Sequence, residues 1–359
     1  MDDLNARLSR LSPDRRSLLQ RLINERSGVL GPKLADSGAP QIYRLSLPDD
    51  DDTVNCFLIG PPWALVDTGP NTPQAREALL HALASRGIGP QHIQTIILTH
   101  HHYDHSGGLT WLRRLTGARI LGHRWTRDWL SGAEDQRAAY RSFLREFARF
   151  CGLQHELEDT WNRPPKGEIS LDDTVTGSTI LALGDQNWMI RETPGHTGGS
   201  ICLASPAGDL LAGDTVLARL TVTAFYEPLA ESNPPEPSGL LRYRATLRRL
   251  SNQPVQQIHP GHGLPFSGLN KMIGITLQRH ERRADQVMTL LTPAGDTVLG
   301  ITRQIFPRLP RIYLYPALTD IRGTLDLLME HGRITVHGDN PAIFVPTRNT
   351  SPVDICPST

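Results

Sequence analysis

A histidine-rich loop after a short apolar run is the feature that most constrains this chain. Residues 95–98 are Thr-Ile-Ile-Leu, and after Thr99 the chain continues His100-His101-His102-Tyr103-Asp104-His105. The apolar run predicts a buried strand. A loop leaving a strand can aim alternate side chains at one point and its last two at a second point. The sequence therefore predicts a strand that delivers a metal-binding loop.

Three further segments repeat this design, in which a β-rich or apolar run ends in a glycine-flanked ligand. They present His196, Asp214 and His262, each directly after a glycine. Glycine lets the backbone approach a metal ion closely. With the loop, the chain offers seven candidate ligands, the other four being His100, His102, Asp104 and His105. Seven ligands are enough for two metal ions that share one carboxylate and a bridging solvent molecule.

The ligand types favour an open, catalytic metal site. Neutral imidazoles and carboxylates suit Zn²⁺, which we favour, and also Fe or Mn. A structural zinc site would usually recruit cysteine thiolates, but the four cysteines are widely scattered and form no CxxC pair. The expected cofactors are thus two divalent metal ions.

Over about residues 40–275 the chain resembles the metallo-β-lactamase superfamily. The resemblance is carried by Asp67-Thr68-Gly69, then the HxHxDH run, then His, Asp and His in that order. It implies an α/β fold, the αββα sandwich, in which helices face two β-sheets and the metals lie at one edge. It further implies a first metal on His100, His102 and His196, a second on Asp104, His105 and His262, a bridging Asp214, and a supporting Asp67.

The pattern along the chain predicts four parts. They are an N-terminal helical extension (1–38), a catalytic domain (39–275) with a helical insertion (124–165), a winged-helix-like domain (276–349) and a tail (350–359). Strands are expected at 56–59, 63–66, 95–98, 119–121, 179–183, 188–191, 200–203 and 255–258. The last domain should contain helices at 278–291, 298–306 and 318–331 and a hairpin of 334–336 with 342–345. We expect it to make homodimer contacts or to wall the active-site entrance.

Aromatic side chains gather in the insertion and after Asp214. They either form a helical pair that buries its own aromatics or a hydrophobic lid over the site. The candidate pocket residues are His123, Trp125, Trp129, Tyr140, Phe143, Phe225 and Tyr226. His101 is expected to point outward or to support the ligands, and His280 is expected at the surface.

Two metals of this kind predict attack by metal-bound hydroxide on a carbonyl or phosphoryl group. Asp104 could also orient the nucleophile and carry its proton to the leaving group, as catalytic acid and base. The ligand set resembles the hydroxyacylglutathione-hydrolase-like branch of the superfamily, which favours thioester hydrolysis. Candidate substrates are acyl-CoA, acyl-glutathione and acyl groups on a carrier protein.

Residues 8–22 resemble the short linker peptides near modules of nonribosomal peptide and polyketide synthases. The resemblance implies that the extension docks to a synthase assembly line in natural product biosynthesis. The N-terminus shows no secretory signal, so the expected compartment is the cytoplasm. Apolar runs are far shorter than the roughly 18 residues of a membrane span, so no membrane partner is expected.

Other hydrolytic and oxidative reactions remain open alternatives. Lactone or β-lactam hydrolysis needs the same metals and differs in pocket shape. A metal-dependent ribonuclease is disfavoured because 37 basic residues balance 37 acidic ones, so nucleic acid is an unlikely partner. An iron-dependent oxygenase is disfavoured because His196 stands where we expect carrier-linked hydroxylases to carry a carboxylate. A scaffold without metal is disfavoured because every ligand is intact.

Overall fold

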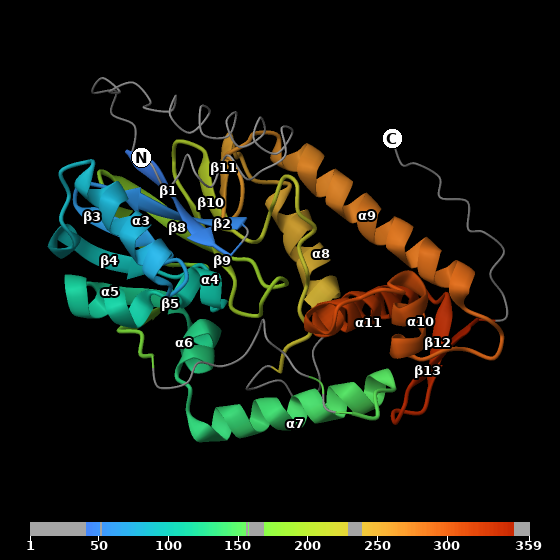
Figure 1. Ribbon diagram of the computed structural model, residues 1–359. Helices are drawn as coiled ribbons and strands as arrows, with labels where there is room; N and C mark the ends of the chain where they lie inside the picture. Colours follow the sequence, from blue (N-terminus) through green and yellow to red (C-terminus); the bar gives the residue numbers. More distant parts are fainter. Residues whose placement is uncertain (1–40, 51, 156, 158–168, 229–238, 348–359) are drawn as a thin grey trace, which may run out of the picture. The chain divides into compact units, whose positions relative to one another are not determined.

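The computed structural model describes residues 41–347, except 51, 156, 158–168 and 229–238 (Figure 1). The expected helix in 1–38, the tail 350–359 and part of the insertion 124–165 lie outside these residues. Within the described residues, short strands and helices alternate, as the sequence predicts for an α/β fold. No helix among them is both long and apolar enough to cross a membrane.

The first sheet has six strands in the order β1-β2-β3-β4-β5-β6. Their bounds are β1 Ile42–Asp49, β2 Asp52–Ile59, β3 Trp63–Val66, β4 Ile93–Ile97, β5 Arg119–His123 and β6 Asp173–Val175. β1, β2 and β3 are antiparallel neighbours, whereas β3 to β6 run parallel. The sequence did not indicate β1 or β6, and β2 begins before the expected residue 56.

The second sheet has five strands in the order β11-β10-β9-β8-β7. Their bounds are β7 Ile180–Leu183, β8 Gln186–Glu192, β9 Ile201–Ala204, β10 Asp209–Gly213 and β11 Gln257–Pro260. β7 to β10 are antiparallel neighbours, and β11 pairs with β10 in parallel. The strand expected at 255–258 therefore lies two residues later, and it ends immediately before the Gly261-His262 pair.

The inner faces of the two sheets form one apolar core. Phe57 and Val66 from the first sheet pack in the same cluster as Trp188, Ile190 and Leu211 from the second. Each of these side chains is at most 2% exposed. Two sheets that bury their facing sides in this way hold the metal-ligand loops in fixed positions at the strand ends.

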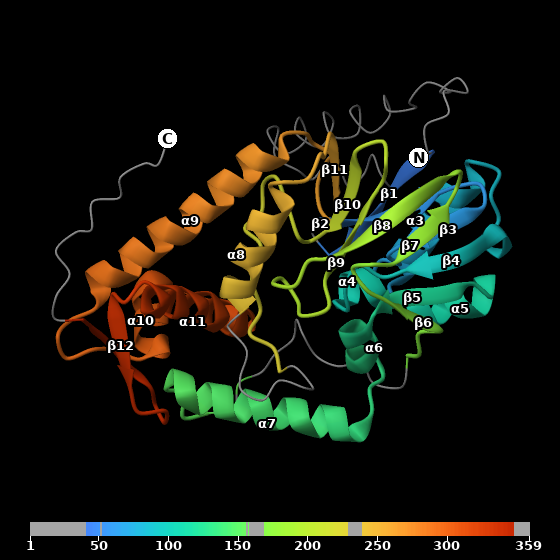
Figure 2. The same cartoon turned by 180° about the vertical axis from the view of Figure 1, so that it is seen from behind.

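Helices cover the outer faces of both sheets (Figures 1 and 2). α3 (Pro73–Ala84) and α5 (Leu109–Thr116) share a core with the first sheet. α8 (Gly239–Leu250) and α9 (Leu269–Leu290) share one with β10 and β11 of the second. The arrangement is the expected αββα sandwich. The described residues also contain two 3₁₀ turns, η1 (Pro90–His92) before β4 and η2 (Arg311–Tyr313) in the C-terminal region.

The insertion forms two helices, α6 (Arg124–Leu130) and α7 (Glu134–Cys151). Figure 2 shows α7 beyond the sheets, running from below α6 towards the C-terminal helices. Its aromatic face is buried, since Phe147 and Cys151 belong to the same core as α8 and α9. These two helices account for most of the insertion's described residues, and its bounds at 124–165 stay a prediction.

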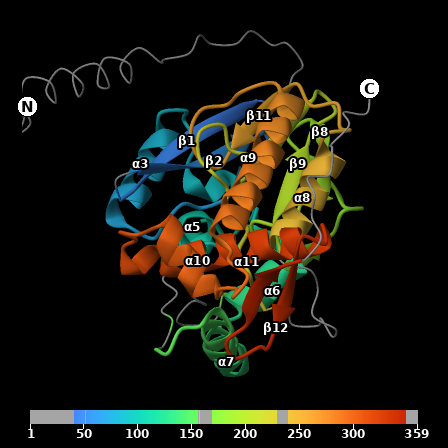
Figure 3. The ribbon, with the colours of Figure 1, turned by 90° about the vertical axis from the view of Figure 1, so that its right-hand side faces the viewer.

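Beyond residue 276 the structure contains the expected three helices and hairpin. Besides α9 they are α10 (Val298–Ile305), α11 (Leu314–Glu330), β12 (Ile334–His337) and β13 (Ile343–Pro346). α9 and α11 begin earlier than expected, and Figure 3 shows α9 crossing α11. The winged-helix-like character and the domain boundary at residue 276 stay predictions.

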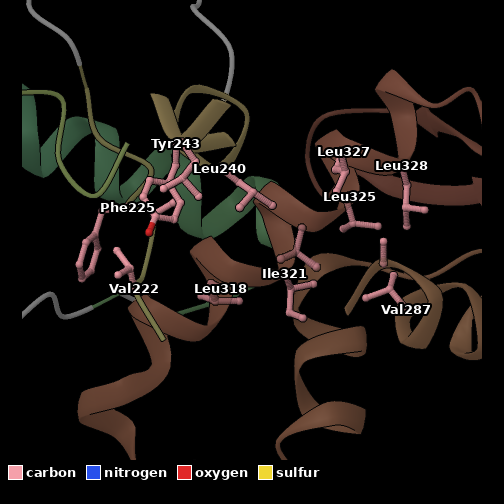
Figure 4. Close-up of a cluster of buried hydrophobic side chains, with 14 of the residues drawn as sticks. Val222, Phe225, Leu240, Tyr243, Val287, Leu318, Ile321, Leu325, Leu327 and Leu328 are labelled. Atoms are coloured by element: carbon pink, nitrogen blue, oxygen red, sulfur yellow. The ribbon is translucent and has the colours of Figure 1, made fainter. Parts of the chain in front are cut away.

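The C-terminal helices share a core with the catalytic part of the chain. Val222, Phe225 and Leu240 lie in one cluster with Leu318 and Ile321 of α11, as Figure 4 shows. The region beyond residue 276 also lies in the same compact unit as the two sheets. The helices therefore support the loop after β10, which carries Asp214 at its start.

His280 is not at the surface, contrary to expectation. It lies on α9 and is 7% exposed, with its ring 5.8 Å from that of Tyr243 on α8. Burial and the neighbouring Arg244 lower the pKa of His280 to about 4. The sequence pattern did not indicate that His280 is buried, because its burial comes from the packing of α9 against α8, which are separate segments of the chain.

Candidate metal centre

The histidine-rich loop follows β4 as expected and turns into the short helix α4 (Tyr103–Ser106). His100 and His105 are at most 1% exposed, and His102 stands at the N-terminus of α4. The change from extended backbone to helix separates the loop into two halves. One half carries His100 and His102, and the other carries Asp104 and His105.

The first group of ligands is formed by three imidazoles. His102 Nδ1 lies 3.1 Å from His100 Nε2 and 3.0 Å from His196 Nε2. His196 comes from the loop after β8, so two distant segments meet here. Three ring nitrogens that converge this closely form a ready set of ligands for one cation.

The second group combines a carboxylate with two imidazoles. Asp104 Oδ2 lies 3.1 Å from His262 Nε2 and 3.4 Å from His105 Nε2. His262 comes from the turn after β11. These three side chains present ligand atoms within 4.8 Å of one another.

Asp214 lies between the two groups. Its Oδ1 is 3.4 Å from His105 Nε2, and its Oδ2 is 3.5 Å from His262 Nε2 and 3.7 Å from His196 Nε2. A carboxylate in contact with both groups can bridge two metals, as the sequence predicts. The structure thus brings together all seven expected ligands.

Buried ligand atoms that make no hydrogen bond test whether the cluster fits a metal. His105 Nε2 and Asp214 Oδ1 are fully buried and 3.4 Å apart, and neither makes a hydrogen bond among the described residues. Leaving such atoms unsatisfied would cost free energy, and both are directed at the cluster. The set of nitrogen and oxygen donors suits a divalent transition metal, so the residues fit the cofactor that the sequence predicts.

The charges divide the cluster into two electrostatic environments. Burial, reinforced by the neighbouring imidazoles, holds the pKa values of His100 and His102 well below the usual range. Burial would also lower the pKa of His262, but Asp104 and Asp214 outweigh it and raise this pKa to about 9. The second group therefore lies in a negative potential, which attracts cations.

Contacts behind the ligands fix which ring nitrogen faces the cluster. Asp67 Oδ2 lies 2.8 Å from His105 Nδ1 and also accepts a 2.7 Å hydrogen bond from the Thr99 hydroxyl. His196 Nδ1 and His262 Nδ1 lie 2.8 and 2.9 Å from backbone carbonyl oxygens. Each of these three rings therefore turns Nε2 to the cluster. Asp67 lies behind the ligands, where the sequence expected it.

Comparison with known proteins agrees with this geometry. Residues 49–262 match the family model described as the metallo-beta-lactamase superfamily, which is more than half of the chain. The chain belongs to this superfamily. It is accordingly a metallo-hydrolase of the metallo-β-lactamase type, and the two-sheet sandwich and the ligand order both fit that membership.

Individual superfamily members show the same relationship. A probable metallo-hydrolase of Bacillus subtilis is 27% identical over 308 residues, covering 82% of this chain and 93% of its own. A hydroxyacylglutathione hydrolase of Maricaulis maris is 29% identical over 121 residues, covering 33% of this chain and 32% of its own. The solved structure of a metallo-beta-lactamase family protein from Thermus thermophilus is 26% identical, with a TM-score of 0.67, covering 85% of this chain and 98% of that one.

A cavity of about 260 Å³ lies next to the superfamily's metal-ligand loop. Its walls include three aromatic side chains of the insertion, Trp125, Trp129 and Tyr140, which the sequence proposed as pocket residues. His101 and the backbone of Gly198, which follows the ligand His196 by two residues, join them. The cavity therefore adjoins the two segments that carry His100, His102 and His196, although none of the seven ligands lines it, and it extends over the insertion.

Other proposed pocket residues do not line this cavity. Phe143 and Tyr226 stack on each other in the core, with ring centroids 5.9 Å apart. Phe225 packs against the His102 and His196 rings, at 5.1 and 5.7 Å. The remaining one, His123, is 6% exposed, and its Nε2 lies 3.4 Å from Glu192 Oε1. Their roles in substrate binding stay predictions.

Sequence reasoning missed the part played by His101 and Glu227. His101 does not point outward, because its side chain is 3% exposed and its Nε2 lies 3.4 Å from Glu227 Oε1. Its ring lies 4.7 Å from that of Trp129. Glu227 directly follows two residues that the sequence did single out, but no metal-ligand pattern includes it. Only the fold brings the two side chains together.

Proposed function

We propose that this metallo-hydrolase cleaves acyl thioesters. The observation that carries the proposal is the cavity beside the ligands, whose walls include the aromatic side chains of Trp125, Trp129 and Tyr140. Aromatic walls favour an apolar acyl group by about 0.8 kcal/mol for each CH₂ group removed from water. A thioester carbonyl placed at the cluster would direct its acyl group into this space.

The chain's own side chains supply the positions that hydrolysis needs. Bound divalent metals would acidify water and polarise the carbonyl. Asp104 Oδ2, 3.1 Å from His262 Nε2 and part-exposed, is placed to accept the proton of the attacking water and to pass it to the leaving group. Asp67 holds His105 from behind, so that the second group keeps its geometry.

Two relatives support a thioester as the substrate. One is named an atrochrysone carboxyl ACP thioesterase, from Emericella nidulans, and is 24% identical over 269 residues. The other is the hydroxyacylglutathione hydrolase already described. Both names refer to compounds in which sulfur carries the acyl group, and the cavity beside the ligands suits such a group.

Zinc is the metal that we propose for this centre. The compartment that we propose is the cytoplasm.

A carrier protein of a synthase assembly line is the partner that we propose for a bound acyl group. This idea rests on residues 8–22, which lie outside the described residues. Lactone hydrolysis is the second candidate, because the cavity would also accept a small neutral ring and the same carbonyl chemistry applies. The two candidate functions can be distinguished by testing how kcat/KM depends on the ring size of lactones and on the acyl-chain length of thioesters.

The test uses one purified sample whose metal content has been measured. Acyl-CoA, acyl-glutathione and acyl-carrier thioesters, lactones, β-lactams and RNA are compared by kcat/KM. We expect thioesters with apolar acyl groups to be the best substrates, and two added carbons to raise kcat/KM roughly tenfold until the cavity is full. If kcat/KM did not change with acyl length, lactone hydrolysis would become the favoured function. Turnover by a metal-free sample would contradict the metal-dependent mechanism.

A further inference from the structure

A buried amide on β2 lies beside the turn that carries the ligand His262. Asn55 is fully buried and stands among the buried apolar residues of this strand. Burying an amide there is costly unless its polar atoms make hydrogen bonds. Asn55 Nδ2 donates to the carbonyl oxygens of Pro260 and Gly263, at 2.9 and 2.8 Å. The amide therefore bonds the turn on both sides of the ligand.

The backbone of the same strand completes the contact with the turn. The Asn55 N–H donates a 2.7 Å hydrogen bond to Gly261 O, and Thr53 O lies 2.9 Å from His262 Nδ1. Each of the four residues 260–263 thus has a hydrogen bond to residue 53 or residue 55 of β2. One strand of the first sheet therefore holds the turn that follows the last strand of the second sheet.

The turn needs an external restraint because glycines flank its ligand. Gly261 directly precedes His262, and Gly263 directly follows it with a φ of 83°. Glycine adopts more backbone conformations than other residues, so the sequence of the turn does not by itself fix the direction of the imidazole. The hydrogen bonds from β2 supply that restraint. They keep His262 Nε2 directed at Asp104 and Asp214, from which it lies 3.1 and 3.5 Å.

Arg44 of β1 fixes the orientation of the amide. Its Nη1 donates to Asn55 Oδ1 at 3.1 Å and lies 3.5 Å from Gly263 O. A guanidinium group can only donate, so it pairs with the oxygen of the amide and leaves both amide N–H groups for the carbonyl oxygens of the turn. A flipped amide would place donor against donor and oxygen against oxygen. The surrounding donors and acceptors therefore admit one orientation.

The first group of ligands is held by other segments of the chain. His196 Nδ1 lies 2.8 Å from Thr223 O, and the Thr246 hydroxyl donates a 2.7 Å hydrogen bond to Pro194 O, two residues before His196. Neither contact involves β1 or β2. Loss of the Asn55 amide should therefore disturb the second group of ligands and leave the first in place.

We propose that Asn55 is a positioning residue of the second metal site, with Arg44 in support. Asn55 acts through His262, because its hydrogen bonds go to the turn and not to the cluster itself. The inference concerns the metal centre alone and does not depend on a thioester as the substrate. Contacts behind a metal ligand commonly change metal affinity by roughly 10- to 100-fold, so the second site should respond on that scale.

The test is a calorimetric titration of the metal-free, full-length protein with Zn²⁺. The wild type should bind two ions. In Asn55→Asp, which keeps the shape but loses both amide donors, the affinity for one ion should fall by roughly 10- to 100-fold, while that for the other changes by less than about threefold. Asn55→Ala should behave in the same way. Arg44→Met keeps the Asn55 donors, so its loss should be smaller, roughly three- to tenfold.

Diffraction at the zinc absorption edge shows which group loses its ion. In crystals of Asn55→Asp we expect reduced occupancy at the group of Asp104, His105 and His262, and full occupancy at the other group. Loss from the first group, or wild-type affinity for both ions, would overturn the proposal. If the Asn55 variants do not fold, Arg44→Met decides the question, since Arg44 is only part-buried. Wild-type affinity for both ions in this variant would then reject the proposal.

Thr302→Val is the matched control. The Thr302 hydroxyl is also a buried side-chain donor to a backbone carbonyl oxygen, that of Val298, but it lies in α10. This variant should keep both Zn²⁺ affinities within about threefold of the wild type. An equal loss of affinity in Thr302→Val and Asn55→Asp would show a general effect of removing a buried hydrogen bond and would overturn the proposal.

Discussion

Asp104 is the ligand with the greatest freedom to take part in the reaction. Its side chain is 23% exposed, whereas that of His105 is fully buried and that of Asp214 is 10% exposed. Its Oδ2 contacts two imidazoles of the second group. At the scale of single residues, this combination of solvent access and ligand contact marks it as the group to change first.

We expect Asp104→Asn to lower kcat/KM by about 100-fold or more while the protein remains folded. The amide keeps the volume but loses the charge that binds a metal and accepts a proton. Metal analysis should show loss from the second group with the first retained. Asp209→Asn is the control, since Asp209 also contacts a histidine, His259, at 2.9 Å, away from the cluster. Near-normal turnover in Asp104→Asn would remove this residue from the mechanism.

Sequence predicted the ligands better than the substrate site. The ligands stand in glycine-flanked turns at strand ends, so residue type and local pattern together single them out. Glu227 has no such pattern, and its approach to His101 depends on the path of the loop after β10. His280 was misplaced for the same reason. A side chain's burial is set by the elements that pack on it, which are remote in sequence.

At the scale of elements, the turn after β11 shows why glycine precedes a ligand. Gly261 lies where an added Cβ would contact Asp214 Oδ1 and approach His105 Cε1 to 2.7 Å. Its backbone N–H also donates a 2.7 Å hydrogen bond to Gly213 O, which ties β11 to the turn that carries Asp214. The close approach of these two turns is what brings His262 and Asp214 together.

We expect Gly261→Ala to displace Asp214 and His105 and to abolish most metal binding. Metal content should fall to less than half, and turnover should fall by about 100-fold with it. Gly274→Ala is the control, because a Cβ added to Gly274 of α9 would meet open space, and alanine should stabilise that helix by about 1 kcal/mol. Normal metal content in Gly261→Ala would show that the turns can separate without loss of the site.

The contact between α8 and α9 predicts a pH dependence of stability. The pKa of His280 is lowered to about 4, first by burial and then by Arg244. An unfolded histidine has a pKa near 6.5, so the unfolded chain takes up a proton before the folded chain does. The free energy of unfolding is therefore not reduced by His280 above pH 6.5. It falls as the pH drops from 6.5 towards 4, because the unfolded chain binds a proton that the folded chain does not.

We expect this loss to reach about 3 kcal/mol of unfolding free energy at pH 4. Urea unfolding of the metal-free protein between pH 7 and pH 4 measures it. The metal-ligand histidines also titrate between pH 7 and pH 4, so the wild type is compared with His280→Gln. The unfolding free energy of His280→Gln should change less steeply with pH than that of the wild type. His81→Gln, at an exposed position of α3, should keep the wild-type slope. Equal slopes for His280→Gln and wild type would contradict the assignment.

Some helices and strands were located from the sequence more accurately than others. The hairpin β12–β13 and the helix α10 were located well, because turn residues and helical periodicity mark them. β1 was missed because its sequence, Ile-Tyr-Arg-Leu-Ser-Leu-Pro-Asp, mixes polar and apolar residues and includes a proline. Its pairing with β2 along its whole length supplies the stability that its own sequence does not indicate.

At the scale of the whole molecule, the C-terminal helices are needed by the catalytic part. Tyr315 of α11 is fully buried, and its hydroxyl donates a 2.6 Å hydrogen bond to Tyr226 O. Its ring also stacks on Phe225, which packs against His102 and His196. A continuous line of contacts therefore runs from α11 to the metal ligands, and the loop after β10 depends on it for support.

Ending the chain at residue 275 should therefore prevent stable folding. The truncation removes α10, α11 and most of α9, and it exposes Phe225, Leu240 and Tyr243, which are at most 6% exposed in the whole protein. Each large side chain returned to water costs about 1.5–3 kcal/mol, and a protein of this kind has about 5–15 kcal/mol in total. We expect an aggregated or loosely packed product without bound metal. A chain ended at residue 347 keeps β13, and we expect it and the full-length protein each to unfold in one cooperative transition. A soluble chain 1–275 that binds metal and unfolds cooperatively would instead show that the region beyond residue 276 is a separate domain.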